Sequence, residues 1–230
     1  MGKRYFTPEL FKFLRELEAN NEKPWWEDNK SRYDEVVKEP ALEFIDDFSS
    51  HLQQISPFFV ADARTVGGSL MRPYRDVRFS KDKTPYKTNV GIQFRHEEGN
   101  DVHAPGVYLH LPPSANCRPA RLCNPETQVA HAIRRKINDE PDKWASVAHS
   151  DPFSGTWSLS HPEDALKRVP KQYDSDHPYA DDIRLKSFTA GSQLSQKYVT
   201  SSDFADSFAD DLRKAKGFCA FLCDAVGLPF

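Results

Sequence analysis

The sequence predicts an α+β domain in which a mostly antiparallel sheet is covered by N-terminal and C-terminal helices. Two observations lead to this class. Apolar residues recur at helical spacing in the first 55 residues and again after residue 124. Between about residues 65 and 112, apolar and polar residues alternate instead, which is typical of strands with one buried face. Because the chain has 230 residues and no internal repeat, we expect a single domain over residues 1–230.

The first predicted helix begins at Pro8, with Thr7 as its cap, and ends at Asn20-Asn21. Residues 23–26, Lys-Pro-Trp-Trp, are predicted as an aromatic connector rather than as helix. A second helical stretch is expected from about Asn29. Pro40 then interrupts that stretch and opens a third helix, which Pro57 ends. The apolar stripe of the third helix is formed by Ala41, Phe44, Ile45, Phe48, Leu52 and Ile55.

Three strands are predicted next, at about residues 65–72, 88–96 and 106–112. The last two show the clearest alternation, and the polar run 97–101 between them favours a hairpin. In the third strand, Tyr108 and His110 alternate with apolar neighbours, so we expect both on the opposite face from the core.

The C-terminal half is predicted to begin with a helix opened by Asn124-Pro125-Glu126. Residues from about 150 to 200 are rich in Pro, Ser and Asp and are expected to wrap around the core with short helices. One final helix is predicted, capped by Ser201 or Ser202. Its core face is formed by Phe204, Phe208, Leu212, Cys219 and Leu222.

Composition excludes several classes of protein. Aromatic residues make up 12% of the chain, which predicts a packed core, and the net charge of −3 argues against a general nucleic-acid binder. The apolar runs are too short to span a membrane, so we expect no membrane association and a cytoplasmic location. The four cysteines lack zinc-knuckle spacing, and no phosphate-cradling glycine loop is present. We therefore predict no metal and no cofactor, while the oligomeric state is left open.

One segment differs from the rest of the chain in charge. Residues 64–87 contain seven Arg and Lys residues against two aspartates, a net charge of +5, so the remainder carries −8. Guanidinium groups match phosphate and carboxylate geometry, which makes this segment the candidate site for an anionic, phosphate-containing ligand. Asp76 and His110 are the candidate catalytic bases, should the protein be an enzyme. The predicted ligand-binding residues are Arg72, Arg75, Arg78, Lys81, Lys83, Tyr86 and Lys87.

Other interpretations of the basic segment remain open. It would equally suit a solvated surface loop, or a brace whose arginines pair with acidic helices such as the one holding Glu43, Asp46 and Asp47. Its interleaved Tyr74, Phe79 and Tyr86 would suit a non-catalytic nucleic-acid module, and a protein-docking surface is the third alternative.

The motifs resemble a known family. Asn20–Trp26 is similar to the opening motif of the domain-of-unknown-function 2461 family, Arg75–Thr88 to its signature, and His103–His110 fits as well. The resemblance covers almost the whole chain and implies a compact cytosolic domain of the kind known from bacteria and fungi as conserved hypothetical proteins. It implies no reaction, substrate or cofactor. The chain departs from the family pattern at Cys117–Cys123, which contains no glycine where members usually have a Gly-rich stretch.

Overall fold

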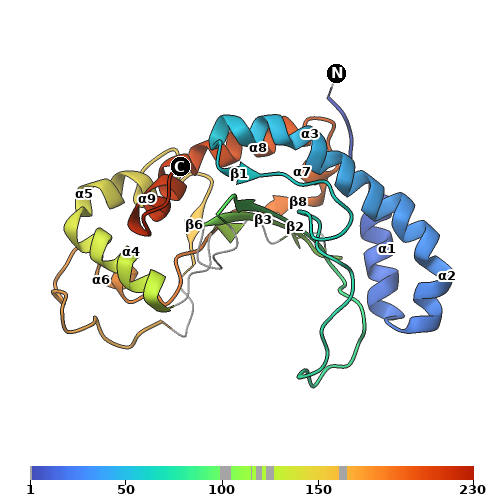
Figure 1. Cartoon of the computed structure of the whole chain (residues 1–230), viewed down its shortest axis with the longest axis horizontal. Helices are drawn as coiled ribbons and strands as arrows, with labels where there is room; N and C mark the ends of the chain where they lie inside the picture. Colours follow the sequence, from blue (N-terminus) through green and yellow to red (C-terminus); the bar gives the residue numbers. More distant parts are fainter. Residues whose placement is uncertain (1, 99–104, 115, 118–120, 123–126, 161–164) are drawn as a thin grey trace.

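The helices and the sheet form layers, as the computed structural model of the chain shows (Figure 1). Two helices, α3 and α8, lie over one face of the central sheet, α1 and α2 flank one end of it, and α4 to α6 with α9 lie at the other end. A long loop between β1 and β2 projects on the side opposite α3. The structure describes residues 2–98, 105–114, 116–117, 121–122, 127–160 and 165–230.

The N-terminal helices are α1 (Pro8–Ala19), α2 (Lys23–Tyr33) and α3 (Glu39–Ile55), with the π-helical turn η1 (Asp34–Lys38) between the last two. The aromatic connector predicted at residues 23–26 is wrong, because Pro24 sits in the first turn of α2, where its missing amide hydrogen is tolerated. Thr7 occupies the N-cap position of α1, as predicted, but its side chain makes no capping hydrogen bond. All six predicted residues of the α3 stripe are buried.

The main sheet has the strand order β1-β2-β3-β5-β7-β6, and neighbouring strands in it pair antiparallel. Its longest strands, β2 (Val90–His96) and β3 (Gly106–Leu111), confirm two of the three predicted strands and pair from Val90–Leu111 to Arg95–Gly106. The connection predicted at residues 97–101 lies partly outside the described residues. The third prediction was wrong: residues 65–72 form no regular strand, and a single bridge joins Leu70 to Ile92.

Short strands complete the two sheets, and the sequence pattern did not predict them. Those of the main sheet are β1 (Phe59–Val60), β5 (Arg121–Leu122), β6 (Ser158–Leu159) and β7 (Ala190–Gly191). A second, two-stranded sheet joins β4 (Asn116–Cys117) to β8 (Leu194–Ser195). A strand of two residues is too short to show an alternation, so its pairing is set by tertiary contacts.

The helices of the C-terminal half are α4 (Thr127–Asp139), α5 (Pro141–Trp144), α6 (Ala180–Ile183), α7 (Gln196–Val199), α8 (Phe204–Lys214) and α9 (Lys216–Ala225). A second π-helical turn, η2 (Ala145–His149), follows α5. The predicted opening of α4 at residues 124–126 lies outside the described residues. The single final helix that the sequence predicted is divided into α8 and α9 around Ala215, and Asp203, not a serine, precedes α8.

The core is continuous from the N-terminal to the C-terminal helices. Phe44 of α3 lies 5.3 Å from Phe204 of α8, and Phe48 lies 5.5 Å from Phe208, measured between ring centroids. Residues far apart in the sequence therefore share one apolar layer above the sheet. No helix in the described part of the chain is long and apolar enough to cross a membrane.

Candidate functional site

The predicted basic loop is an ordered projection, residues 72–87, which we call the finger. Its base is an antiparallel ladder in which Tyr74 bridges Tyr86. The Arg75 amide donates to the Pro85 carbonyl at 2.8 Å, and the Lys87 amide donates to the Pro73 carbonyl at 2.7 Å. These contacts hold residues 73–75 of the outgoing arm in register with residues 85–87 of the returning arm.

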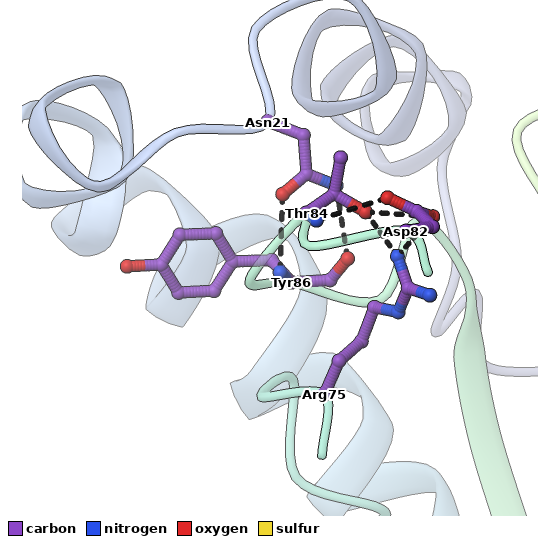
Figure 2. A network of polar contacts seen from close by, with 5 residues as sticks. All are labelled: Asn21, Arg75, Asp82, Thr84 and Tyr86. Carbon is purple, nitrogen blue, oxygen red and sulfur yellow. Dashed lines mark hydrogen bonds and ion pairs between the residues drawn. The ribbon is translucent and has the colours of Figure 1, made fainter. Parts of the chain in front are cut away.

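Asn21 fixes the base of the finger to the end of α1 (Figure 2). Its Nδ2 donates to the Tyr86 carbonyl at 2.9 Å, and the Tyr86 amide donates to Asn21 Oδ1 at 3.0 Å. The Tyr86 ring stacks on Trp26 with 4.3 Å between centroids, and the residue is only 5% exposed. Tyr86, a predicted ligand-binding residue, therefore serves to anchor the finger.

Within the finger, Asp82 holds Arg75. Arg75 Nη1 donates to Asp82 Oδ2 at 2.5 Å and also contacts the Thr84 hydroxyl, while the Thr84 amide donates to Asp82 Oδ1 at 2.9 Å (Figure 2). The hydrogen bond from the Thr84 amide, followed by the one from Arg75, lowers the pKa of Asp82 from 3.8 to about 2. Arg75 is thus engaged in maintaining the shape of the finger.

The tip of the finger is stabilised by its own side chains. Arg78 Nη2 donates to Asp76 Oδ2 at 2.7 Å, and this contact lowers the pKa of Asp76. Lys83 Nζ donates to the Val77 carbonyl at 2.9 Å. Asp76, predicted as a candidate base, is thereby committed to Arg78. Between these contacts Phe79 points outward and is 96% exposed.

A cavity of about 560 Å³ lies beside the base of the finger. One wall is the face of α2 and η1 that carries Trp26, Lys30, Asp34 and Lys38. The facing walls come from residues 65–74, from Lys87 in the returning arm of the finger, and from Arg95 of β2. The cationic residues that line it are Lys30, Lys38, Arg72, Lys87 and Arg95.

These cations have few acidic partners. Lys38 Nζ contacts Asp34 Oδ1 at 3.0 Å, and Asp34 is the only carboxylate among the lining residues. Lys30, Arg72, Lys87 and Arg95 form no ion pair with any residue that the structure describes. Burial, together with the charge of Arg72, lowers the pKa of Lys87 below its ordinary 10.5. The cavity thus concentrates positive charge that the described residues leave largely unbalanced.

Residues 65–68, which line the cavity, belong to a loop that is closed by hydrogen bonds between Asp62 and Ser69. The Ser69 amide donates to the Asp62 carbonyl at 2.7 Å, and the Asp62 amide donates to Ser69 Oγ at 3.0 Å. At Gly68 an added Cβ would lie 2.4 Å from the Arg64 carbonyl oxygen, so this position requires glycine. The loop presents Val66 to solvent at 86% exposure.

The predicted site residues thus fall into separate groups. Arg72 and Lys87 line the cavity, whereas Arg75 and Arg78 are paired with Asp82 and Asp76 in the finger. The brace interpretation expected the acidic residues of α3 to pair with arginines of the basic segment. Glu43 and Asp47 of α3 pair instead with Lys3, at 2.6 and 2.7 Å. Lys81 lies near the tip and is exposed.

His110 has neighbours of its own on the sheet. It lies on the polar face of β3, as predicted, with Nδ1 3.2 Å from Asn89 Nδ2 and 3.3 Å from the Tyr108 hydroxyl. It is not among the residues that line the 560 Å³ cavity, and neither is Asp76. The two candidate bases are therefore not brought together around the unpaired cations.

Sequence analysis missed Lys30, Lys38 and Arg95. A pattern for two of them was present: Trp26, Lys30, Asp34 and Lys38 recur every four residues, which places them on one face of a continuous helical path. Arg95 is a polar residue of an alternating strand, and only the fold reveals which segment faces it.

Fold and site together define an α+β protein with a projecting finger and a cation-lined cavity at its base. The sequence model of the family described as "Conserved hypothetical protein (DUF2461)" matches residues 9–221, so the chain belongs to this family. No curated protein and no solved structure shows a significant match.

Proposed function

We propose that the protein binds an anionic, phosphate-containing ligand in the cavity between α2–η1 and the base of the finger. The observation that carries this proposal is the grouping of Lys30, Arg72 and Lys87 with Arg95 around one cavity, without carboxylate partners among the described residues. Cations brought together in this way repel one another, and a bound anion relieves that repulsion. The volume of about 560 Å³ is in the range of small-ligand sites.

The titration of Lys87 supports the same proposal. Its pKa is lowered by burial and by Arg72, so the charged ammonium is disfavoured relative to the unfolded chain. An anion beside it would favour the charged form and raise its pKa again. The binding of an anion would then be accompanied by proton uptake at alkaline pH, as the pH approaches the lowered pKa of Lys87.

The test is a thermal-shift titration at low salt with inorganic phosphate and pyrophosphate. A ligand at about 100 times its dissociation constant adds roughly 2.7 kcal/mol to the free energy of unfolding. We expect the double variant Arg72→Met and Lys87→Met to lose this stabilisation, since it removes two cavity charges while keeping the aliphatic stems.

The matched control removes two cations outside the cavity, Arg78→Met and Lys81→Met. This control should retain the shift. An equal loss in both variants would indicate attraction to the overall charge of the region, and the absence of a shift with either anion in the unmodified protein would overturn the proposal.

One observation favours a second function, the docking of a nucleic acid or protein partner at the tip of the finger. Phe79 is 96% exposed, and the exposed cations Arg78 and Lys81 lie beside it. Exposed aromatic rings next to cations suit base stacking with phosphate contacts. The substitution Phe79→Ser should then weaken the binding of a single-stranded oligonucleotide without changing the phosphate-induced shift, and unchanged oligonucleotide binding would exclude this function.

A further inference from the structure

The charge of the cavity indicates how many phosphates its ligand carries. Five cations and one carboxylate line it, an excess of four positive charges. A phosphate monoester carries about −1.5 to −2 at pH 7. One phosphate therefore compensates about half of the excess, and two or more phosphates match it.

Most of the remaining lining of the cavity is apolar, and inorganic phosphate would make no contact that uses it. Val66 is 86% exposed and Tyr74 is 46% exposed, and both line the cavity together with Leu70, Met71 and Pro73. Val66 and Tyr74 are two of four large hydrophobic side chains that are exposed in the described part of the chain. A ligand with an apolar body would remove this surface from water.

The aromatic part of the wall favours a flat ligand body. The Tyr74 ring lies edge-on to Trp26, with 6.1 Å between centroids, and is tilted against Tyr86 at 5.6 Å. Two buried rings therefore support Tyr74 from behind while much of its surface stays accessible. A supported and accessible aromatic ring is a stacking platform for a nucleobase.

One polar group on η1 is available to such a ligand. Asp34 uses Oδ1 for Lys38, and the structure gives its Oδ2 no partner in the described part of the chain. A ligand that offers a hydrogen-bond donor to this carboxylate oxygen would fit it.

From this juxtaposition of unpaired cations, an accessible tyrosine ring and the Asp34 carboxylate, we infer that the ligand is a nucleotide carrying at least two phosphates. This inference rests on the proposed function. The phosphates lie among Arg72, Lys87 and Arg95, and the base lies against Tyr74 and Val66. Asp34 accepts a hydrogen bond from a ribose hydroxyl or an exocyclic amine of the base.

The test compares ADP with pyrophosphate by isothermal titration calorimetry at one low salt concentration. Stacking and apolar contact of the base should make ADP bind at least about tenfold more tightly than pyrophosphate. The variant Val66→Ser, at a position too exposed to affect folding, and the variant Tyr74→Ala should each reduce this ratio and leave pyrophosphate affinity unchanged. Phe79→Ser, which removes an exposed apolar side chain outside the cavity, is the matched control and should keep the ratio.

The outcomes separate this inference from the proposed function. If pyrophosphate binds through Arg72 and Lys87 but ADP binds no more tightly, the anion site stands and the nucleotide assignment is overturned. Tighter binding of octyl phosphate than of ADP would also overturn it, in favour of an alkyl chain. A short oligonucleotide that displaces ADP and binds more tightly would assign the cavity to nucleic acid instead. If neither ADP nor pyrophosphate binds, the proposed function fails as well.

Discussion

At the scale of single residues, two aspartates of the finger pair with two of its arginines, and the other cations stay available to a ligand. Asp82 accepts from Arg75, and Asp76 accepts from Arg78. Arg72 and Lys87, nearest the base, have no such partner among the described residues and line the cavity, whereas Lys81 and Lys83, which have none either, lie toward the tip. A charge-rich segment that appears uniform in the sequence is therefore divided into two paired arginines, two cations that line the cavity and two lysines toward the tip.

The titration of Asp82 is a prediction at this scale. Its pKa in the folded protein is about 2, below the ordinary 3.8, so its contribution to stability is complete above pH 3.8 and is lost as the pH falls through about 2. We expect a carbon-detected NMR titration of the Asp82 carboxyl to show a midpoint near pH 2.

The variant Arg75→Met separates the causes of this shift. It removes the arginine but keeps the hydrogen bond from the Thr84 amide, so the midpoint should rise and still remain below 3.8. A midpoint at the ordinary value in the unmodified protein would show that Asp82 does not hold the finger in solution.

At the scale of elements, α2, η1 and α3 form one helical path with one face on the cavity and one face on the core. Pro40 lacks the amide hydrogen that would bond the Val36 carbonyl, and the π-helical turn η1 lies directly before it. The path nonetheless carries Lys30, Asp34 and Lys38 along one side of the cavity. Pro40, which was expected to separate two helices, thus lies within one continuous helical path, and the part of this path before Pro40 lines the cavity.

A pair of phenylalanines tests how the elements contribute to stability. Phe208 of α8 is fully buried against Phe48 and Phe204, whereas Phe79 at the finger tip is 96% exposed. Phe208→Ala should lower the free energy of unfolding by about 3–5 kcal/mol, because it leaves a cavity in the core. Phe79→Ala should stay within about 0.5 kcal/mol of the unmodified protein.

Urea denaturation with matched m-values measures both changes. A large loss of stability for Phe79→Ala would mean that the tip packs against the protein in solution, contrary to the structure. A small loss for Phe208→Ala would contradict the placement of α8 in the core.

The sequence was informative where a pattern is long enough to be periodic. The α3 stripe and the alternation of β2 and β3 were predicted, since burial of one face repeats over many residues. Residues 65–72 were predicted as a strand from scattered apolar residues, yet Val66 is exposed and only Leu70 pairs. Arg95 and the cavity itself could not be predicted, because they depend on how the β1–β2 connection meets α2.

At the scale of the whole molecule, the finger divides the chain into two parts that share one core. Residues before the tip supply α1 to α3 and β1, and residues after it supply β2 and all later elements. The parts are joined by the pairing of β1 with β2 and by the packing of α3 on α8.

Trypsin tests this arrangement. Arg78 and Lys81 are exposed in a segment without regular secondary structure, so we expect cleavage after Arg78. The resulting fragments, residues 1–78 and 79–230, should elute together in size-exclusion chromatography, because the core contacts and the base of the finger are intact. Arg78→Gln should abolish that cut, and separation of the fragments under native conditions would contradict the shared core.

Because the tip of the finger is exposed, the coding sequence can be divided at this position. A break in the coding sequence at the position of Phe79 would yield two polypeptides that each lack a complete core and gain one only by associating. If each half were fused to one of two interacting proteins, binding between those proteins would bring the halves together, and the reassembled protein would report that binding. The nucleotide-sized cavity, whose lining comes from both halves, would form only in the reassembled pair and would supply the readout.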